Sequence, residues 1–248
     1  MAKSRGQPAL PHPSAPNCFA CQWRDRADWC TLTPEDVRVL NEIKTTSTYL
    51  PGQMLFNQGD PCNGLYSMLS GVVSIRKTDV HGRTVLVRLR HPGETMGYRD
   101  FFSGAVFTTS AEALAPTKVC FIRDAAVRSL LERNPSLGLR FLEQVSHDLQ
   151  SAEDTILQTA SLATRARLAH LLLTLKDRHG TVGDDGDLQI ALPLSRQDIA
   201  DLLGTRPETI ARVINALEKD GVAVFSGRMV IVPDLDALLD EIEPAEGP

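Results

Sequence analysis

The part of the chain that most constrains the fold is residues 194–221, near the C-terminal end. Ser195 is a good N-cap for a helix, and Asp198 stands three residues later, where the acidic partner of a capping box belongs. Gly204 then allows the positive φ at which helices commonly end. Pro207 fits the first turn of a second helix, because the N–H that it lacks would have no intrahelical partner there. The segment therefore predicts two short helices joined by a tight turn.

The second helix is expected to begin with Thr205 as its N-cap and Glu208 as the partner in another capping box. Apolar residues recur on it at helical spacing and predict a buried stripe of Ile210, Val213, Ile214 and Leu217. Two apolar runs within residues 222–232, separated by a Ser-Gly-Arg turn, then predict a β-hairpin. The pattern as a whole predicts a winged helix-turn-helix.

The polar face of the second helix suits DNA, because helix-turn-helix proteins insert such a helix into the major groove. Arg212 can donate two hydrogen bonds to a guanine edge, and Glu208 can accept one from a cytosine amino group. Hydroxyl groups can hold phosphates without reading sequence. The expected DNA-binding residues are Ser195, Arg206, Glu208, Thr209 and Arg212. The alternative is an ordinary helical hairpin with solvated charges, in which Glu208 is only a cap. That alternative does not explain why the turn, the caps and the β-hairpin all agree with a winged helix-turn-helix.

Composition limits the compartment and the class of protein. The 248 residues suggest two domains, and the net charge of -5 bears on solubility rather than on a local basic face. No apolar run is long enough to cross a bilayer, and residues 1–17 resemble a flexible tail more than a signal peptide. We therefore expect a cytoplasmic protein with no membrane partner, in a reducing compartment where thiols stay free or bind metal. No nucleophile–base set or phosphate loop points to an enzyme.

The pattern of apolar residues, glycines and cysteines in the rest of the chain predicts an α+β architecture of several segments. Residues 18–45 carry three cysteines and end in a short capped helix, and residues 46–135 contain short apolar runs separated by glycines. The glycine-separated runs predict an antiparallel β-roll as a sensor domain. A long dimerisation helix is expected at residues 136–161 and the winged helix-turn-helix domain at 162–240, with a surface turn at 181–187 and an acidic tail at 241–248.

The long helix carries apolar residues at alternating steps of three and four, which is the pattern of a coiled-coil seam. The expected dimer interface consists of Leu142, Val145, Leu149, Ala152 and Ile156. A homodimer would also match a palindromic operator, because two-fold symmetry in the protein mirrors two half-sites in the DNA. The alternative is a helix that packs only on its own β-roll.

Three stretches carry a resemblance to a known family: residues 51–60, residues 65–73 and residues 207–212. On these motifs, residues 18–238 resemble the CRP/FNR family of bacterial transcription regulators. The resemblance implies a homodimer on double-stranded DNA, with RNA polymerase as a further partner, and it implies that Glu208 and Arg212 read bases. The FNR branch has a serine directly before that arginine, where this chain has Ala211. The preferred half-site is therefore expected to differ.

The cysteines resemble the FNR layout of a [4Fe–4S] cluster, with three clustered thiols before the roll and one remote thiol on its last strands. The resemblance implies that the ligands are Cys18, Cys21, Cys30 and Cys120, since thiolates are the usual ligands of such clusters. The gap between Cys21 and Cys30 is longer than in most FNR relatives. Cys62 is a fifth thiol, interpreted as a bystander or a rival ligand. A zinc site, or thiol–disulfide chemistry without metal, remains an alternative.

The resemblance also bears on the effector and the response. Family members that bind cyclic AMP use a Glu and an Arg-Ser pair, and the aligned positions here are Tyr98, Phe107 and Thr108. We expect no cyclic nucleotide, because the phosphate would lose a charge-assisted contact to arginine. A cluster that controls dimerisation would make the protein respond to oxygen, nitric oxide or redox state. The alternative is a regulator of the CRP type that senses another small ligand.

Overall fold

The computed structural model describes residues 17–183 and 186–242. The chain divides into two compact units, one ending at Gln150 and the other beginning at Ser151, and we call them unit 1 and unit 2. Residues 1–16 of the expected flexible tail and residues 243–248 of the expected acidic tail lie outside the described part of the chain.

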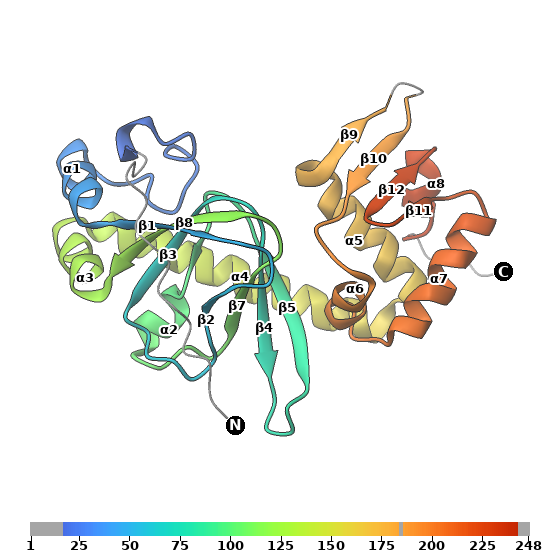
Figure 1. The fold of residues 1–248 in the computed structure, drawn as a ribbon, viewed down its shortest axis with the longest axis horizontal. Coiled ribbons are helices and arrows are strands. Elements are labelled where there is room, and N and C mark those ends of the chain that lie inside the picture. Colours follow the sequence, from blue (N-terminus) through green and yellow to red (C-terminus); the bar gives the residue numbers. More distant parts are fainter. Residues whose placement is uncertain (1–16, 184–185, 243–248) are drawn as a thin grey trace. The chain divides into compact units, whose positions relative to one another are not determined.

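Unit 1 contains two four-stranded antiparallel sheets, in the strand orders β1-β8-β3-β6 and β2-β7-β4-β5 (Figure 1). The strands are β1 (Thr45–Tyr49), β2 (Met54–Phe56), β3 (Gly64–Ser70), β4 (Val73–Thr78), β5 (Thr84–Arg90), β6 (Thr95–Met96), β7 (Ser110–Ala113) and β8 (Thr117–Arg123). Their arrangement confirms the expected antiparallel roll.

A glycine is required at the turn between β3 and β4. Gly71 has a φ of 89°, and a Cβ placed there would lie 2.6 Å from the carbonyl oxygen of Pro116. Because any other residue would meet backbone at that distance, this glycine permits the close approach of the β3–β4 turn to the start of β8. At this turn, the glycine that separates two apolar runs in the sequence is therefore required for a steric reason.

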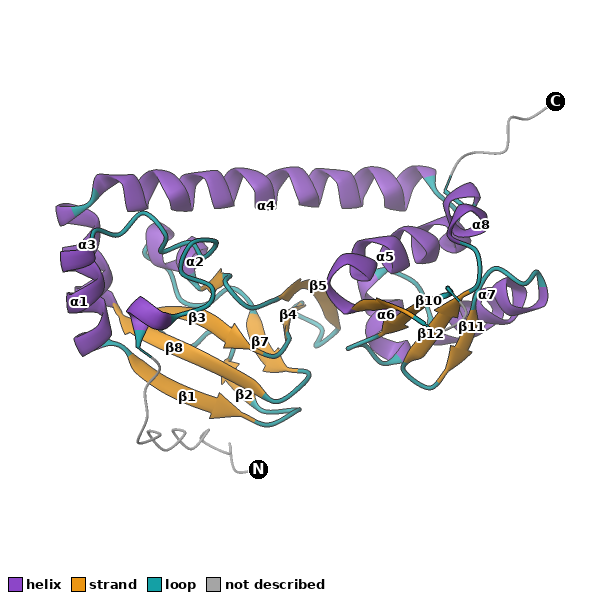
Figure 2. Cartoon of the chain, turned by 90° about the horizontal axis from the view of Figure 1, so that it is seen from above, coloured by secondary structure: helices purple, strands orange, loops and turns teal. Residues whose placement is uncertain are grey.

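The helices of unit 1 gather on one apolar core. They are the 3-10 turn η1 (Cys18–Ala20), α1 (Pro34–Ile43), α2 (Tyr98–Ser103), α3 (Asp124–Arg133) and the start of α4 (Pro135–Ser161). Figure 2 shows α1, α3 and the first turns of α4 grouped at one end of the roll. We call residues 17–33 the leader, and two of its side chains, Trp29 and Leu32, are buried in the same core as Leu65 of β3 and Phe141 of α4.

Unit 2 consists of helices around a third antiparallel sheet, in the order β11-β12-β10-β9. Its elements are α5 (Thr164–His179), β9 (Gly180–Val182), β10 (Leu188–Ala191), α6 (Arg196–Leu202), α7 (Pro207–Lys219), β11 (Val224–Ser226), β12 (Met229–Val232) and α8 (Leu235–Asp240). The hairpin β11–β12 confirms the expected wing. No described helix combines the length and the apolar character that crossing a bilayer requires.

The structure corrects two local expectations in unit 2. The surface turn expected at residues 181–187 includes part of β9, which pairs with β10, and strands of three and four residues are too short to leave a clear periodic signal. Thr205 is not the cap of α7. Arg206 is the N-cap, with φ -104° and ψ 149° and no side-chain cap bond, because the residue before Pro207 is pushed towards extended backbone. By contrast, the capping box of Ser195 and Asp198 is confirmed.

The observed caps predict that substitutions at Ser195 and at Thr205 have different effects on helix stability. Ser195→Ala removes the acceptor for the Asp198 backbone N–H and should weaken the start of α6 by about 1 kcal/mol. Thr205→Ala should have little effect, because its side chain caps nothing in the described structure. Native-state hydrogen exchange of the α6 amides in the full chain measures the difference. Equal acceleration of exchange in both variants would contradict the assignment of the cap.

Candidate functional site

Helix α7 has one buried face and one exposed, charged face. Ile210, Ile214 and Leu217 are buried, Val213 is half-buried, and the side chains on the other side are exposed. The exposed residues are Arg206, Glu208 and Arg212, while Thr209 is half-buried and accepts a 3.4 Å hydrogen bond from Arg212 Nη2. Arg212 has no carboxylate partner among the described residues. Its guanidinium is therefore available to a base edge or a phosphate.

Two arginines of α5 hold this helix-turn-helix together, and neither was expected from the sequence. Arg167 donates from Nη1 to the carbonyl oxygen of Leu203, at 2.5 Å, at the turn between α6 and α7. Arg165 pairs with Asp220 at 2.6 Å, just after α7, and also with Glu241. Because α5 is bonded to the turn before α7 and to the residue directly after it, these contacts help to position α7 within unit 2. Such pairs join residues far apart in sequence, so no local pattern reveals them.

In unit 1, three thiols line one cavity of about 60 Å³. Cys18 and Cys21 come from the leader, and Cys120 comes from β8, where it stands opposite Thr46 of β1 and Ser67 of β3. The remaining walls are largely apolar and include Trp29, Leu32, Val37, Leu40, Leu69 and Ile122. The fold thus brings a remote thiol and two leader thiols to one cavity.

Two cations face the same cavity. Lys44 is 7% exposed, and its Nζ lies 3.1 Å from Asn41 Oδ1, while Arg24 lies on another wall. Burial raises the pKa of Cys120 to about 11 and also raises the pKa of Cys18, although the positive charge of Lys44 opposes both shifts. At neutral pH these thiols are therefore protonated and weakly nucleophilic, and a metal that bound them would have to displace their protons.

Cys30, expected as the fourth ligand, does not line this cavity. Its backbone N–H donates to Ala27 at 3.0 Å, and the two residues before it are bonded to the roll. Asp28 accepts from the Thr95 backbone N–H at 2.9 Å, and the Trp29 indole donates to Thr95 Oγ1 at 3.1 Å. These bonds hold the segment that carries Cys30 in a position where Cys30 does not line the cavity.

The remaining cysteine, Cys62, also lies outside the cavity. Its thiol is 3.7 Å from both the Gly64 and the Gly97 carbonyl oxygens. Cys18, Cys21 and Cys120 therefore share the cavity, whereas Cys30 and Cys62 do not line it. No three metal-ligating side chains in the described part of the chain are close enough together to hold an ion.

The positions aligned with cyclic-nucleotide ligands are engaged in internal contacts. Tyr98 is 2% exposed, and its hydroxyl contacts Arg90 at 2.8 Å and also Asp148. Phe107 stacks on Phe56 with the ring centroids 3.9 Å apart, and Thr108 donates to Asp100 at 2.7 Å. None of these side chains offers a cationic group to a phosphate.

The stripe expected on α4 is largely open to solvent. Leu142 and Leu149 are each 60% exposed and Ile156 is 70% exposed, and Ala152 is exposed as well. Val145 is half-buried, because it packs against the core of unit 1. Leu139 and Leu157, which the seam pattern did not include, are also exposed. A row of large apolar side chains in water is unfavourable unless a further surface covers it.

Comparisons with known proteins agree with both units. Residues 46–134 match the family described as the cyclic nucleotide-binding domain, and residues 166–241 match the Crp-like helix-turn-helix domain. The chain is 29% identical over 228 residues to the transcriptional activator protein FnrL of Cereibacter sphaeroides, covering 90% of this chain and 91% of that protein. It is 26% identical over 211 residues to the anaerobic regulatory protein of Pasteurella multocida, covering 85% of this chain and 77% of that one.

Among solved structures, FixK2 from Bradyrhizobium japonicum superposes with a TM-score of 0.72 at 25% sequence identity. The alignment covers 82% of this chain and 99% of that one. The similarity therefore extends over both units.

The cavity makes a prediction about thiol reactivity. Cys120 is 5% exposed and its pKa is raised to about 11, so its thiolate fraction is small at pH 8 and grows as the pH rises towards 11. In the native, reduced, metal-free chain, iodoacetamide should modify half-buried Cys30 well before Cys120. Peptide mass spectrometry measures the two rates, and modification in guanidinium, where all five cysteines should react alike, is the control. Comparable native rates for Cys30 and Cys120 would contradict this description of the cavity.

Proposed function

The chain belongs to the CRP/FNR family of transcription regulators, which are DNA-binding proteins and not enzymes, and from this membership we propose that it binds a palindromic operator as a homodimer and responds to the redox state of its surroundings through its cysteines. The DNA partner requires a cytoplasmic location. RNA polymerase is the proposed partner of the operator-bound protein.

The observation that carries the DNA-reading proposal is the pair of opposed faces of α7. Three of its residues are buried on one side, and Arg206, Glu208 and Arg212 are exposed on the other. We assign base contacts to Glu208 and Arg212 and phosphate contacts to Thr209 and Ser195. Arg206, at the N-cap of α7, is assigned to the same interface.

This assignment predicts a selective loss of DNA affinity. Arg212→Ala should weaken binding to a duplex selected by the wild-type protein from a random-sequence pool by about 1–3 kcal/mol and should relax the preference at one base pair. Lys219→Ala, which removes an exposed cation from the last turn of the same helix, is the matched control and should retain the preference. Fluorescence anisotropy with matched and mismatched duplexes measures both variants. Unchanged discrimination in Arg212→Ala would remove Arg212 from the base-reading set.

The exposed stripe of α4 supports the homodimer. Leu142, Leu149 and Ile156 recur every seven residues, with Val145 and Ala152 between them, so a second copy of the helix could cover all five. Dimerisation also doubles the DNA contacts, so a modest change in the free energy of dimerisation changes operator occupancy strongly.

The shared cavity of Cys18, Cys21 and Cys120 supports sensing through a thiolate-ligated group. We propose a [4Fe–4S] cluster held by these residues and Cys30, with the four thiols brought closer together than they are here and Cys30 moved to the cavity. The cluster would supply iron–sulfur bonds that oxidants attack. The positive charges of Lys44 and Arg24 would stabilise the thiolates. The name of the Pasteurella multocida relative, an anaerobic regulatory protein, supports a response to oxygen or to a related oxidant.

The separation of Cys30 from the cavity favours a second candidate. If Cys30 stays bonded through its neighbours to the roll, three thiols remain at the cavity. They would form a thiol–disulfide switch or, once drawn closer together and joined by one further ligand, hold a zinc ion. In either candidate the regulator needs no cyclic nucleotide, because Tyr98 and Phe107 are occupied by internal contacts.

Metal content separates the two candidates. Protein purified without oxygen should contain about four irons and four sulfides per chain and show a broad visible absorbance that air bleaches. Cys120→Ser should abolish this absorbance, whereas Cys62→Ser, which changes a thiol outside the cavity, should retain it. A colourless anaerobic protein that contains zinc or no metal would contradict the cluster and support the second candidate.

A further inference from the structure

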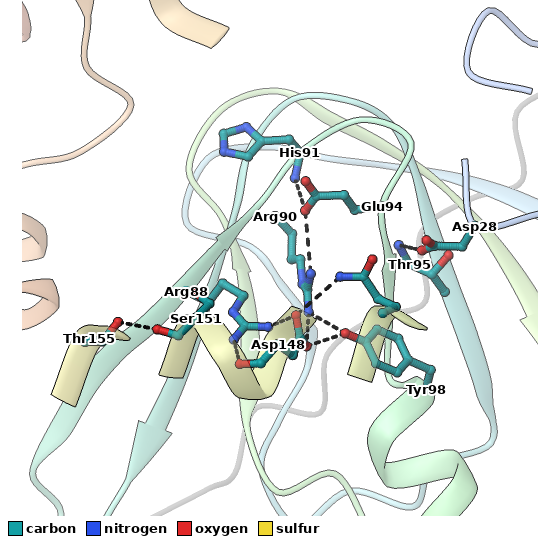
Figure 3. Close-up of polar contacts among 11 residues, drawn as sticks. Asp28, Arg88, Arg90, His91, Glu94, Thr95, Tyr98, Asp148, Ser151 and Thr155 are labelled. Atoms are coloured by element: carbon teal, nitrogen blue, oxygen red, sulfur yellow. Dashed lines mark hydrogen bonds and ion pairs between the residues drawn. The ribbon is translucent and has the colours of Figure 1, made fainter. Parts of the chain in front are cut away.

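One short segment of the roll, residues 90–98, is bonded to the leader. The Thr95 backbone N–H donates to the Asp28 carboxylate at 2.9 Å, and Thr95 Oγ1 accepts from the Trp29 indole at 3.1 Å. Thr95 and Asp28 are both buried. Figure 3 shows this pair at one side of a larger polar cluster.

The same segment is bonded to α4 through Asp148. The Asp148 carboxylate accepts from Arg90 Nη2 at 2.8 Å, from the Tyr98 hydroxyl and from Gln144 at 3.3 Å (Figure 3). Arg88 of β5 pairs with the same carboxylate and also donates to the Asp148 carbonyl oxygen at 3.0 Å. We call Asp148, Arg88, Arg90 and Tyr98 the junction.

The junction is too buried to rearrange freely. The side chain of Arg90 is 9% exposed, that of Asp148 is 16% exposed, and Tyr98 is 2% exposed. The Arg90 guanidinium contacts Asp148 and Tyr98 through one nitrogen and lies 3.7 Å from Glu94 through the other. If Asp148 moved away from the roll, it would leave a buried cation with fewer partners, which is strongly unfavourable. The Asp148 carboxylate therefore contributes a specific polar contact to the position of α4 on the roll.

An apolar contact runs beside the polar one. The Trp29 ring meets the Phe141 ring of α4 edge-on, with the ring centroids 5.5 Å apart, and the Tyr98 ring stacks on the same Phe141 ring with the centroids 5.8 Å apart. The leader, residues 90–98 and α4 thus touch one another through both polar and aromatic groups. A change in the leader alters the surroundings of the residues that hold Asp148.

We propose that Asp148 is a positioning residue for DNA binding: the junction fixes α4 on the roll when the leader is docked, and so presents the apolar stripe of α4 for dimerisation. This proposal rests on the proposed homodimer. It adds that the leader and Asp148 are energetically coupled, because both are bonded to residues 90–98.

The test compares Asp148→Asn with Asp154→Asn in the full chain. Asp154 lies on the same helix, is exposed, and has no hydrogen-bond or ion-pair partner among the described residues, so it is a matched control. Sedimentation velocity measures dimer dissociation, and anisotropy measures affinity for a duplex selected by the wild-type protein. Asp148→Asn should weaken both by about tenfold or more, and Asp154→Asn should stay within about twofold of wild type. Equal behaviour of the two variants would overturn the proposal.

A double-mutant cycle tests the coupling itself. Asp28→Ala removes the leader's acceptor for Thr95, and in this background Asp148→Asn should have a clearly smaller effect on dimer dissociation than in the wild type. If the two substitutions change the dimer dissociation constant by independent factors, the coupling is overturned. If Asp148→Asn does not fold, Tyr98→Phe takes its place, because it removes one donor to Asp148 and keeps the ring on Phe141.

Amide hydrogen exchange distinguishes a failure of this proposal from a failure of the proposed homodimer. If the wild-type chain is a monomer at micromolar concentration, the proposed dimer fails, and amide hydrogen exchange of residues 135–150 then tests the junction alone. Faster exchange there in Asp28→Ala and in Asp148→Asn, but not in Asp154→Asn, supports the junction. Unchanged exchange in all three overturns it.

Discussion

The arrangement of unit 1 depends on the contact between the buried side chains of Trp29 and Phe141. Their rings meet edge-on within a core that also contains residues of α1, α2, α3, β3 and β8. An aromatic pair buries a large apolar area, and its loss would expose both the leader and the first turns of α4 to water. Because one core serves the leader, the roll and α4, none of the three can shift without disturbing the packing of the others.

The cavity of three thiols follows from this packing. Trp29 and Leu32 form part of its wall, so the same side chains that dock the leader also bring Cys18 and Cys21 towards Cys120. Burial in this cavity raises the pKa of Cys18 and of Cys120 and keeps these two thiols protonated, and the positive charge of Lys44 makes their deprotonation less costly when a metal binds. Docking of the leader and the chemistry of the cysteines are therefore linked in the fold.

Local signals in the sequence predicted local structure well. The capping box of Ser195 and Asp198, the turn at Gly204 and the amphipathic face of α7 each depend on residues a few positions apart, and the structure confirms them. The Thr205 cap was wrong because the backbone preference imposed by Pro207 outweighed a side-chain cap. Arg90 and Asp148 form a close ion pair although they are far apart in the sequence, and no periodicity marks either residue. The placement of Cys30 was equally hidden, because it depends on the bonds of Asp28 and Trp29 to Thr95.

Hydrogen exchange after removal of the shared aromatic contact tests the central claim, that the docked leader stabilises α4, most directly. Trp29→Ala in the full chain should accelerate amide exchange in residues 135–148 of α4 and leave exchange in α7, which belongs to unit 2, unchanged. Exchange in residues 135–148 that matches the wild-type rate, in a variant whose leader has become exposed, would contradict the account.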